Sequence, residues 1–491
     1  MNDQGEADYV AERKPVIAIA GASGYIGNNL LDCLKGKATV IGLSRNGGRH
    51  KDTEDVKWRS CDLFSMKDAE KGLEGADIAV YLVHSMMKSA KLTQGNFEDM
   101  DVILADNFAQ AAKRQGIQQI VYLSGIIPEE HESQLSQHLR SRLEVERVLR
   151  AYDVPVTALR AGLIVGPKGS SFPILSKLVK RLPIMILPKW TSTKTQPVAL
   201  KDVLTALTSI ITDFDLKDRS IDVGGPDVMT YRTMMKATAN VMGKNPKMLD
   251  VPFFSLTLSR LWLRLVTNTP KEMVYPLVAS LKHPMVVHRS HTIEGISNGQ
   301  TPFKEAAQIA MDADAKKEKR STPLLPTLGP LKQDVRSVQR IKLPHGWTAD
   351  EAARYYVKWL ETFLNPWVHT TVDSDLNCKI GFLGNRTLLE LSYSGERSTE
   401  DRALYYITGG FLLDDQANER GRMEFRKIPG ANEAIIAIHD YLPSLPWFVY
   451  YVTQANMHAF VMCAFRKHMN RLSVSERDRQ YVRNLTVEDT P

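Results

Sequence analysis

The stretch Gly21-Ala-Ser-Gly24-Tyr-Ile-Gly27 decides the fold of the N-terminal part of this chain. It follows the apolar run VIAIA (16–20) directly and opens a segment of helical spacing. In a strand–turn–helix unit the first glycine permits the tight turn, the second lets the backbone approach a pyrophosphate, and the third lets helix and strand pack closely. The helix N-terminus adds unpaired N–H groups and partial positive charge. The pattern predicts a dinucleotide-binding loop rather than a merely structural turn. The cofactor contacts expected from it are Gly21, Ser23, Gly24, Tyr25, Ile26 and Gly27.

Short apolar runs alternate with amphipathic stretches from this loop to about residue 152. This spacing is typical of right-handed βαβ crossovers, so we expect an α/β fold with a doubly wound parallel Rossmann sheet. The predicted strands are 16–20, 38–43, 77–83, 119–124 and 154–160, and the predicted helices include 24–36, 97–115 and 134–151. Residues 161–284 are expected to complete the same lobe.

The composition changes after residue 284, where Pro, Gly and an alternation of Ala, Asp and Lys predict a linker over 285–342. Residues 343–480 then predict a second, α+β domain with an antiparallel sheet and a long C-terminal helix over about 446–470. The expected domains are thus an NAD(P)-binding Rossmann domain over 15–284, the linker, and the domain over 343–480, with tails at 1–14 and 481–491. The predicted strands of the second domain are 367–372, 376–382, 387–394, 402–412, 421–428 and 434–441.

The chain has 63 Lys and Arg against 56 Asp and Glu, a formal net charge of +7. More than half of this excess lies in 304–342, and no basic–aromatic stripe appears, so nucleic acid is not an expected partner. The four cysteines are far apart and show no metal-ligand spacing, so no metal site is predicted and a reducing, cytoplasmic location is expected. The polar N-terminus predicts no cleaved signal, and no apolar run reaches the roughly 20 residues that span a bilayer.

The end of the second predicted strand bears on cofactor choice. An NAD-specific site usually has a carboxylate here, whereas this sequence has Ser44-Arg45-Asn46. Arg45 is suited to pair with a 2′-phosphate, which a carboxylate would repel, so NADP(H) is favoured over NAD(H); the alternative is an exposed basic loop. Further cofactor contacts are expected at the ends of neighbouring strands, from Asp62, Leu63, Val83 and His84. His84 is equally consistent with a polar residue that merely ends its strand.

Taken together, these elements resemble the short-chain dehydrogenase/reductase superfamily in its extended or atypical branch. The resemblance covers about residues 15–285 and also rests on YLSG (122–125), RAGLIVGP (160–167), QPVALKDV (196–203) and VGGPDVMTY (223–231). Within that branch the chain is similar to bacterial NAD(P)-binding proteins of the YbjT type and to NmrA-like proteins. The YbjT-type proteins share HLRSR (138–142) in similar form and carry an additional C-terminal domain.

One departure from the superfamily concerns catalysis. Catalytic members carry a Tyr and a Lys four residues apart on one helix face, and the Lys lowers the pKa of the Tyr. Here the matching residues are His138 and Arg142, and no Tyr stands four residues before any Lys. Ser124 occupies the position of the catalytic Ser. Either His138 donates the proton, with Arg142 at the nicotinamide ribose and Ser124 polarising a carbonyl, or His138 and Arg142 are helix-surface residues that hold the cofactor or the fold without hydride chemistry.

The resemblance therefore implies an NADP(H)-binding oxidoreductase that acts on a carbonyl or quinone-type substrate. The alternative is a non-catalytic NADP(H) redox sensor, which would engage a regulatory protein partner; a homodimer is also open.

The C-terminal part faintly resembles helix-grip domains of the polyketide-cyclase or START type, which hold a small apolar ligand between sheet and helix. The aromatic and Met residues of its last helix are more typical of ordinary core than of ligand contacts. Peripheral membrane contact is not favoured, because the basic residues gather at the helix C-terminus, where the dipole already favours them. The residues in question are Trp447, Tyr450, Tyr451, Met457, His458 and Met462.

Overall fold

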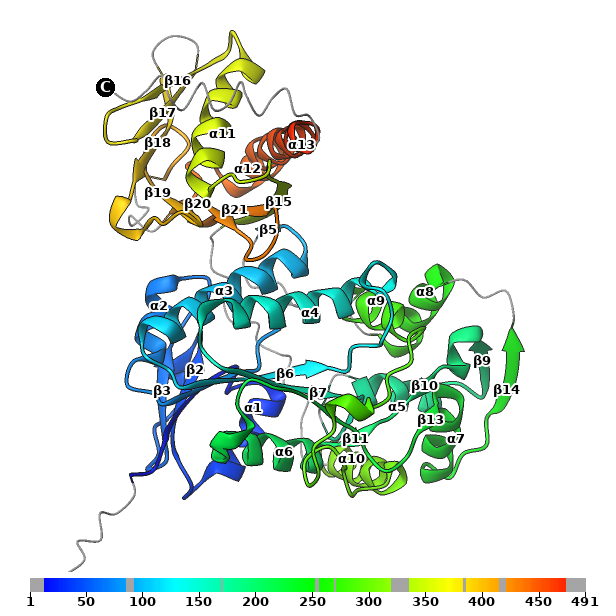
Figure 1. The fold of residues 1–491 in the computed structure, drawn as a ribbon. Coiled ribbons are helices and arrows are strands. Elements are labelled where there is room, and N and C mark those ends of the chain that lie inside the picture. Colours follow the sequence, from blue (N-terminus) through cyan, green and yellow to red (C-terminus); the bar gives the residue numbers. More distant parts are fainter. Residues whose placement is uncertain are drawn as a thin grey trace, which may run out of the picture. The chain divides into compact units, whose positions relative to one another are not determined.

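The computed structural model describes residues 13–84, 92–167, 169, 171–251, 256–268, 271–318, 335–382, 386–414 and 421–473. These residues form two compact units. The first takes the described residues within Met1–His84 and Leu104–Pro323, and the second takes those within Ser85–Ile103 and Leu324–Pro491. Each unit is built around a large sheet of its own (Figure 1).

A seven-stranded parallel sheet with the order β3-β2-β1-β4-β6-β7-β12 forms the centre of the first unit. The chain runs outward from β1 through β2 to β3 and then crosses to β4 on the other side of β1. Ligands of such sheets bind where the strand order reverses, at the carboxyl ends of the strands. The predicted doubly wound Rossmann sheet is confirmed. Its strands are β1 (Val16–Ala20), β2 (Thr39–Ser44), β3 (Val56–Ser60), β4 (Ile78–Tyr81), β6 (Gln119–Gly125), β7 (Val156–Ala161) and β12 (Ser220–Val223).

Helices cover both faces of this sheet, with α1 (Tyr25–Leu34) and α6 (Leu200–Thr212) on one face and α2 (Met66–Leu73) and α4 (Gln137–Leu149) on the other (Figure 1). Because both faces are covered, the strands are apolar throughout, which explains their unbroken apolar runs. The other helices are α3 (Phe97–Arg114), which is divided between the two units, α5 (Ser171–Arg181), α7 (Tyr231–Val241), α8 (Leu256–Thr267), α9 (Lys271–Ser280) and α10 (Phe303–Glu318). Three two-stranded sheets join β8 (Ile164–Val165) to β11 (Val198–Ala199), β9 (Ile184–Pro188) to β14 (Lys247–Val251), and β10 (Lys194–Thr195) to β13 (Met229–Thr230).

Two segments of the predicted linker over 285–342 are folded parts of the units. Helix α10 buries Phe303 and three alanines in a core that it shares with α5 and α7. Strand β15 (Val335–Lys342) belongs to the sheet of the second unit. The small alanines of α10 give a weak apolar pattern, and arginines interrupt that of β15, so the composition resembled a linker. Residues 319–334, 1–12 and 481–491 lie outside the described residues.

The second unit contains an eight-stranded sheet with the order β16-β17-β18-β19-β20-β21-β15-β5. Seven strands are antiparallel to their neighbours, and β5 (Leu92–Gln94) pairs parallel with β15 at the edge. The predicted α+β fold with a C-terminal helix is confirmed. The remaining elements are β16 (Val368–Val372), β17 (Cys378–Phe382), β18 (Arg386–Tyr393), β19 (Arg402–Gly409), β20 (Arg422–Lys427), β21 (Glu433–Tyr441), α11 (Ala349–Leu364), α12 (Trp447–Val452) and α13 (Gln454–Leu472).

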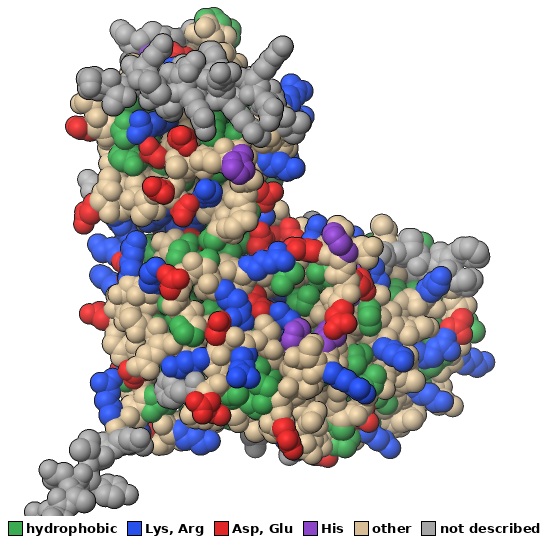
Figure 2. All heavy atoms as spheres, viewed as in Figure 1, with side chains coloured by type: hydrophobic (Ala, Val, Ile, Leu, Met, Phe, Trp, Pro, Cys, Tyr) green, Lys and Arg blue, Asp and Glu red, His purple; other side chains and the backbone are tan. Residues whose placement is uncertain are grey.

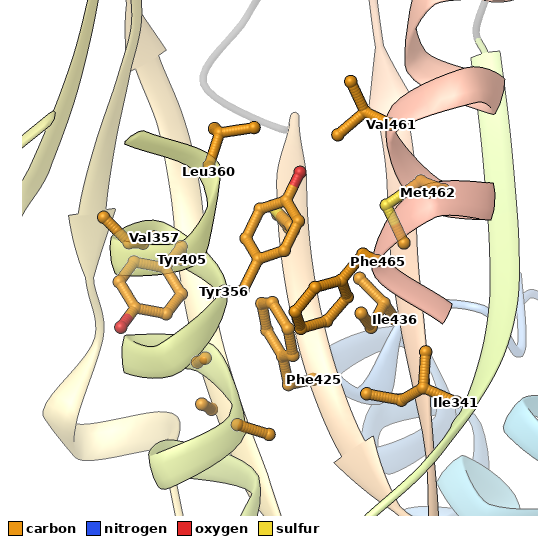
Figure 3. Close-up of a cluster of buried hydrophobic side chains, with 14 of the residues drawn as sticks. Ile341, Tyr356, Val357, Leu360, Tyr405, Phe425, Ile436, Val461, Met462 and Phe465 are labelled. Atoms are coloured by element: carbon orange, nitrogen blue, oxygen red, sulfur yellow. The ribbon is translucent and has the colours of Figure 1, made fainter. Parts of the chain in front are cut away.

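Aromatic side chains fill the layer between this sheet and the helices α11 and α13 (Figure 3). The ring of Tyr356 from α11 lies 4.9 Å from that of Phe465 from α13 and 5.7 Å from that of Phe425 on β20. Phe465 and Met462 are buried completely or nearly so. Part of the space between sheet and helix, where a small apolar ligand was expected, is therefore filled by packed core side chains.

The residues expected as core at the start of the last helix divide into two groups. Tyr450 and Met462 are buried, and His458 is half-buried, whereas Tyr451 is 56% and Met457 58% exposed. The helical region is broken at residue 453 between α12 and α13, and both helices carry exposed apolar side chains. The side chain of Trp447 lies outside the described residues.

Charged side chains of both signs are interspersed over the face of the molecule shown in Figure 2. The net charge of +7 is therefore not gathered into one patch on this face. Among the residues that the structure describes, no helix combines the length and the apolar character that a membrane crossing requires.

Candidate functional site

The glycine loop joins β1 to α1, and its three glycines are needed for three different reasons. Gly21 has φ +86°, in the left-handed region, and a β-carbon there would lie 3.2 Å from the carbonyl oxygen of Leu82. The N–H of Gly24 donates to the carbonyl oxygen of Gly21 at 2.9 Å and closes the turn. A β-carbon on Gly27 would lie 2.3 Å from that oxygen and 2.7 Å from the Cα of Ala22. Side chains are thus excluded where a pyrophosphate is expected.

The residues around the start of α1 fit a cofactor phosphate. Gly24 is the N-cap and offers no side-chain acceptor to the first N–H groups of the helix, so these remain available to an anion. The Ser23 hydroxyl donates to the Ser44 hydroxyl at 3.2 Å, which places the end of β2 beside the loop. Ile26 packs partly into the core beneath the loop.

Tyr25, the other predicted contact in the loop, lies against two glycines. A β-carbon on Gly166 would lie 2.2 Å from the Tyr25 hydroxyl oxygen, and one on Gly169 would lie 3.1 Å from its ring. Burial, and to a smaller degree the charge of Asp314, raises the pKa of this hydroxyl. Tyr25 therefore packs beside the loop as a protonated phenol.

The predicted adenine and ribose contacts lie at the carboxyl ends of β2 and β3. Arg45 is exposed, next to Ser44, whose hydroxyl accepts from the N–H of Asn46 at 3.4 Å. Asp62 is half-buried and accepts from a backbone N–H of its own turn. Leu63 is buried, and its carbonyl oxygen accepts from the side chain of Asn107 at 2.8 Å. Arg45 and Asp62 thus keep accessible polar groups, whereas Leu63 serves mainly as core.

The predicted catalytic helix α4 meets the end of β4 through Arg142. Its guanidinium donates to Nδ1 of His84 and, at 3.3 Å, to the hydroxyl of Tyr122. Because a guanidinium only donates, Nδ1 of His84 accepts, and the proton of the neutral ring is on Nε2. The ring of His138 lies 5.3 Å from that of His84, centroid to centroid. Val83, before His84, is half-buried.

Arg142 is only 6% exposed, so the interpretation of this residue as part of the helix surface is wrong. Spacing along the helix alone does not show that its side chain reaches the strand ends.

Ser124 lies at the carboxyl end of β6, beside β4 in the sheet. Tyr81 pairs with Tyr122, so Ser124, two residues on, and His84, three residues on, end neighbouring strands. The Ser124 hydroxyl is buried, and within the described part of the chain it has no hydrogen-bond partner. A buried hydroxyl left unpaired is costly, which marks a place where a ligand atom would complete its bonding.

Two residues that sequence reasoning missed position the start of α4. The N–H of Ser136, the N-cap, donates to Nε2 of His283 at 3.1 Å, and Nδ1 of His283 donates to a carboxylate oxygen of Glu130 at 2.8 Å. His283 is 3% exposed. A serine before an amphipathic run is a recognisable N-cap signal, but no local pattern links it to a histidine nearly 150 residues later. These contacts fix the helix that carries His138 and Arg142.

Residues 21–178 match the family model described as NAD(P)H-binding. The glycine cradle and most of the strands of the Rossmann sheet lie within the residues that this model matches.

Two curated proteins are similar to parts of the chain. The auxiliary protein GraX of Staphylococcus aureus is 33% identical over 114 residues, which are 23% of this chain and 37% of that protein. Ceramide reductase of Caulobacter vibrioides is 25% identical over 279 residues, which are 53% of this chain and 81% of that protein. The chain thus spans little more than a third of the first relative and about four fifths of the second.

Among solved structures, triphenylmethane reductase of Citrobacter sp., complexed with NADP(H), is 17% identical with a TM-score of 0.48. The superposition covers 60% of this chain and 99% of that one.

Proposed function

We propose that this protein is an NADP(H)-dependent reductase of a carbonyl or quinone-type substrate, with Ser124, His138 and Arg142 at the reacting centre. The observation that carries the proposal is the unpaired, buried hydroxyl of Ser124, on the sheet edge to which the glycine loop belongs. A substrate carbonyl oxygen would accept the hydrogen bond that this hydroxyl lacks. The relative named ceramide reductase supports the same class of reaction and an apolar, lipid-like substrate.

The side chains divide the work by their chemistry. When bound, the nicotinamide cofactor supplies the hydride that reduces the carbonyl carbon. Ser124 donates a hydrogen bond to the carbonyl oxygen and polarises the C=O bond. His138 holds the proton that this oxygen takes up, as an imidazole does readily near neutral pH. Arg142, held by Tyr122 and His84, adds a fixed positive charge near the oxygen on which negative charge grows.

Isotope transfer tests the reaction itself. NADPH deuterated at the reactive carbon is offered with a panel of quinones, aldehydes and long-chain ketones, and the products are analysed by mass spectrometry. We expect deuterium on the reduced carbon of at least one product. Tight NADPH binding without transfer to any member of a broad panel would overturn the proposal.

The variants Ser124→Ala and His138→Gln are expected to lower kcat by about 100-fold or more, the usual contribution of a polarising or proton-donating group. The dissociation constant of NADPH should stay within about threefold, because neither side chain is expected at the phosphates. His131→Gln is the matched control, since His131 is exposed and lies outside the strand ends. Equal activity of His138→Gln and the control would remove His138 from the reaction.

A second candidate function is a non-catalytic NADP(H) sensor, favoured by the engagement of Arg142 with Tyr122 and His84 inside the protein. If the protein is such a sensor, it has no catalytic turnover that a variant of Ser124 or His138 could change. The amount of a partner protein captured from host extract would instead differ between NADPH and NADP⁺.

Arg45 is proposed to select NADP(H) through the 2′-phosphate. Because charge-assisted hydrogen bonds contribute about 1.5–3 kcal/mol, Arg45→Ala should raise the dissociation constant of NADPH roughly 10- to 100-fold. The constant for NADH should stay within about twofold. Calorimetric titration of both cofactors measures the ratio, with Lys35→Ala as control, since Lys35 is an exposed cation at the other end of α1. An unchanged ratio would contradict the assignment.

A further inference from the structure

A buried carboxylate and two histidines meet at the edge of the Rossmann sheet, away from the glycine loop. Asp222, on β12, has no solvent exposure. One of its oxygens, Oδ2, accepts from the backbone N–H of His288 at 3.1 Å and from Nδ1 of the same residue at 2.7 Å. The other, Oδ1, is buried and unpaired within the described residues. Nδ1 of His291 lies 3.7 Å from Oδ1, too far for a hydrogen bond, and is likewise buried without a partner there.

We infer that Asp222, His288 and His291 form a binding site for a divalent transition-metal ion of the Zn²⁺ type. The three residues offer ligand atoms that all lie within 4.8 Å of one another. Zinc binds histidine nitrogen and carboxylate oxygen at about 2.0–2.2 Å, so one ion fits between Oδ1 and Nδ1 of His291 at their present separation. Two imidazoles with one carboxylate suit Zn²⁺, Co²⁺ or Ni²⁺ better than Mg²⁺ or Ca²⁺, which prefer oxygen alone.

The charged groups around Asp222 favour the binding of a cation. The residue paired with Asp222 on the neighbouring strand is Arg160, but its guanidinium makes two hydrogen bonds to Glu146, at 2.9 and 3.0 Å. That positive charge is thereby matched by another carboxylate. Within the described part of the chain, His288 is the residue that hydrogen-bonds to Asp222, and burying a carboxylate with so few partners is costly. A bound dication would compensate it and occupy both unpaired atoms.

Solvent reaches the two histidines of the site, and metal binding can displace a proton from His288. The side chain of His291 is 34% exposed and that of His288 16%, so an ion has a path from solvent, and water can complete its coordination. Binding through Nδ1 of His288 displaces the proton that this atom now shares with Asp222, so affinity should rise with pH. Both histidines lie at the 3₁₀ turn η6 (Arg289–His291), so the ion would fasten this segment to the edge strand β12.

Cobalt spectroscopy on the full chain tests the site. Chelator-treated protein is titrated with Co²⁺, and we expect visible d–d bands of a tetrahedral N/O site without the thiolate charge-transfer band that a cysteine ligand would add. Zn²⁺ should displace Co²⁺ and raise Tm. His291→Ala, at a partly exposed position, should weaken binding about 10- to 100-fold, and Asp222→Asn, which keeps the shape of the side chain, should do the same.

His131→Ala is the control for adventitious binding by an exposed histidine, and it should leave affinity unchanged. Absence of d–d bands in the wild-type protein, or equal bands in His291→Ala, would overturn the inference. So would a Tm that Zn²⁺ leaves unchanged.

Discussion

Gly27→Ala should raise the dissociation constant of NAD(P)H about 10- to 100-fold. The added methyl group would lie 2.3 Å from the carbonyl oxygen of Gly21 and 2.7 Å from the Cα of Ala22. Both are backbone atoms of the turn, so they cannot move aside without opening the turn at which the cofactor phosphates are expected. Overpacking of this kind costs about 1–3 kcal/mol in ordinary cores, and here the displaced atoms are those of the cofactor cradle itself.

Calorimetric titration measures the effect, and circular dichroism shows whether the variant is folded. Gly395→Ala is the matched control, because a β-carbon there would be 3.8 Å from its nearest neighbour, a ring carbon of Tyr393 in the second unit. If Gly27→Ala fails to fold, Gly24→Ala takes its place, since its β-carbon would meet only the Gly21 oxygen, at 3.0 Å. Cofactor binding within threefold of wild type in both variants would contradict the role of the loop.

Glu424→Gln should destabilise the second unit by about 3–5 kcal/mol, the range seen when one member of a buried ion pair is removed. Glu424 is wholly buried on β20 and accepts from Nε of Arg402 at 2.9 Å and from Arg426 at 3.1 Å. Its other carboxylate oxygen lies 3.0 Å from Nε2 of His439. A neutral amide would remove the negative charge that pairs with both buried guanidinium groups.

This cluster also determines an acid sensitivity. Burial alone would raise the pKa of Glu424, but the charges of Arg426 and Arg402 outweigh it and hold the pKa well below its usual range. A carboxyl whose pKa is lower in the folded state stabilises the fold above its unfolded pKa, about 4.3. That contribution is lost as the pH falls from there through the folded pKa. We therefore expect the second unit of the wild-type protein to lose stability over this acid range, and Glu424→Gln to lose less.

Hydrogen exchange of peptides from β19, β20 and β21, followed in increasing urea, measures the second unit separately from the first. Glu390→Gln is the control from the same sheet, since Glu390 forms a surface pair with Lys379 at 3.4 Å. Exposed pairs of this kind contribute at most about 1 kcal/mol. If both variants lose the same stability, the buried cluster has no special role.

The first sheet could be predicted because its signals are local. The apolar run at 16–20 is β1 to the residue, and the glycines that follow it open α1 as expected. Strand β15 was missed because Arg336, only 2% exposed, and Arg340 interrupt its apolar alternation. These arginines are held by ion pairs to Asp440 and Asp99, and such pairing exists only after the sheet has formed.

The candidate site also has residues that the sequence predicts and contacts that it does not. Ser124, His138 and Arg142 could be named from their places in a familiar pattern. The contacts of Arg142 with His84 and Tyr122 follow from the register of parallel strands, which no local pattern contains. Asp222 and His288 are 66 residues apart in the chain, and neither has a sequence signal that points to the other.

Strand β5 has a consequence for how this protein is made. It pairs over Leu92–Gln94 with Val335–Ser337 of β15, a partner that leaves the ribosome roughly 240 residues later. At about 5–20 residues per second, translation needs about 12–50 s to supply that partner. During this interval the edge of β5 is available for unintended pairing. Each unit takes in two separated stretches of the chain. If the chain were divided near residue 320, β5 would remain in the first fragment and the rest of its sheet would lie in the second. Both fragments would therefore be incomplete.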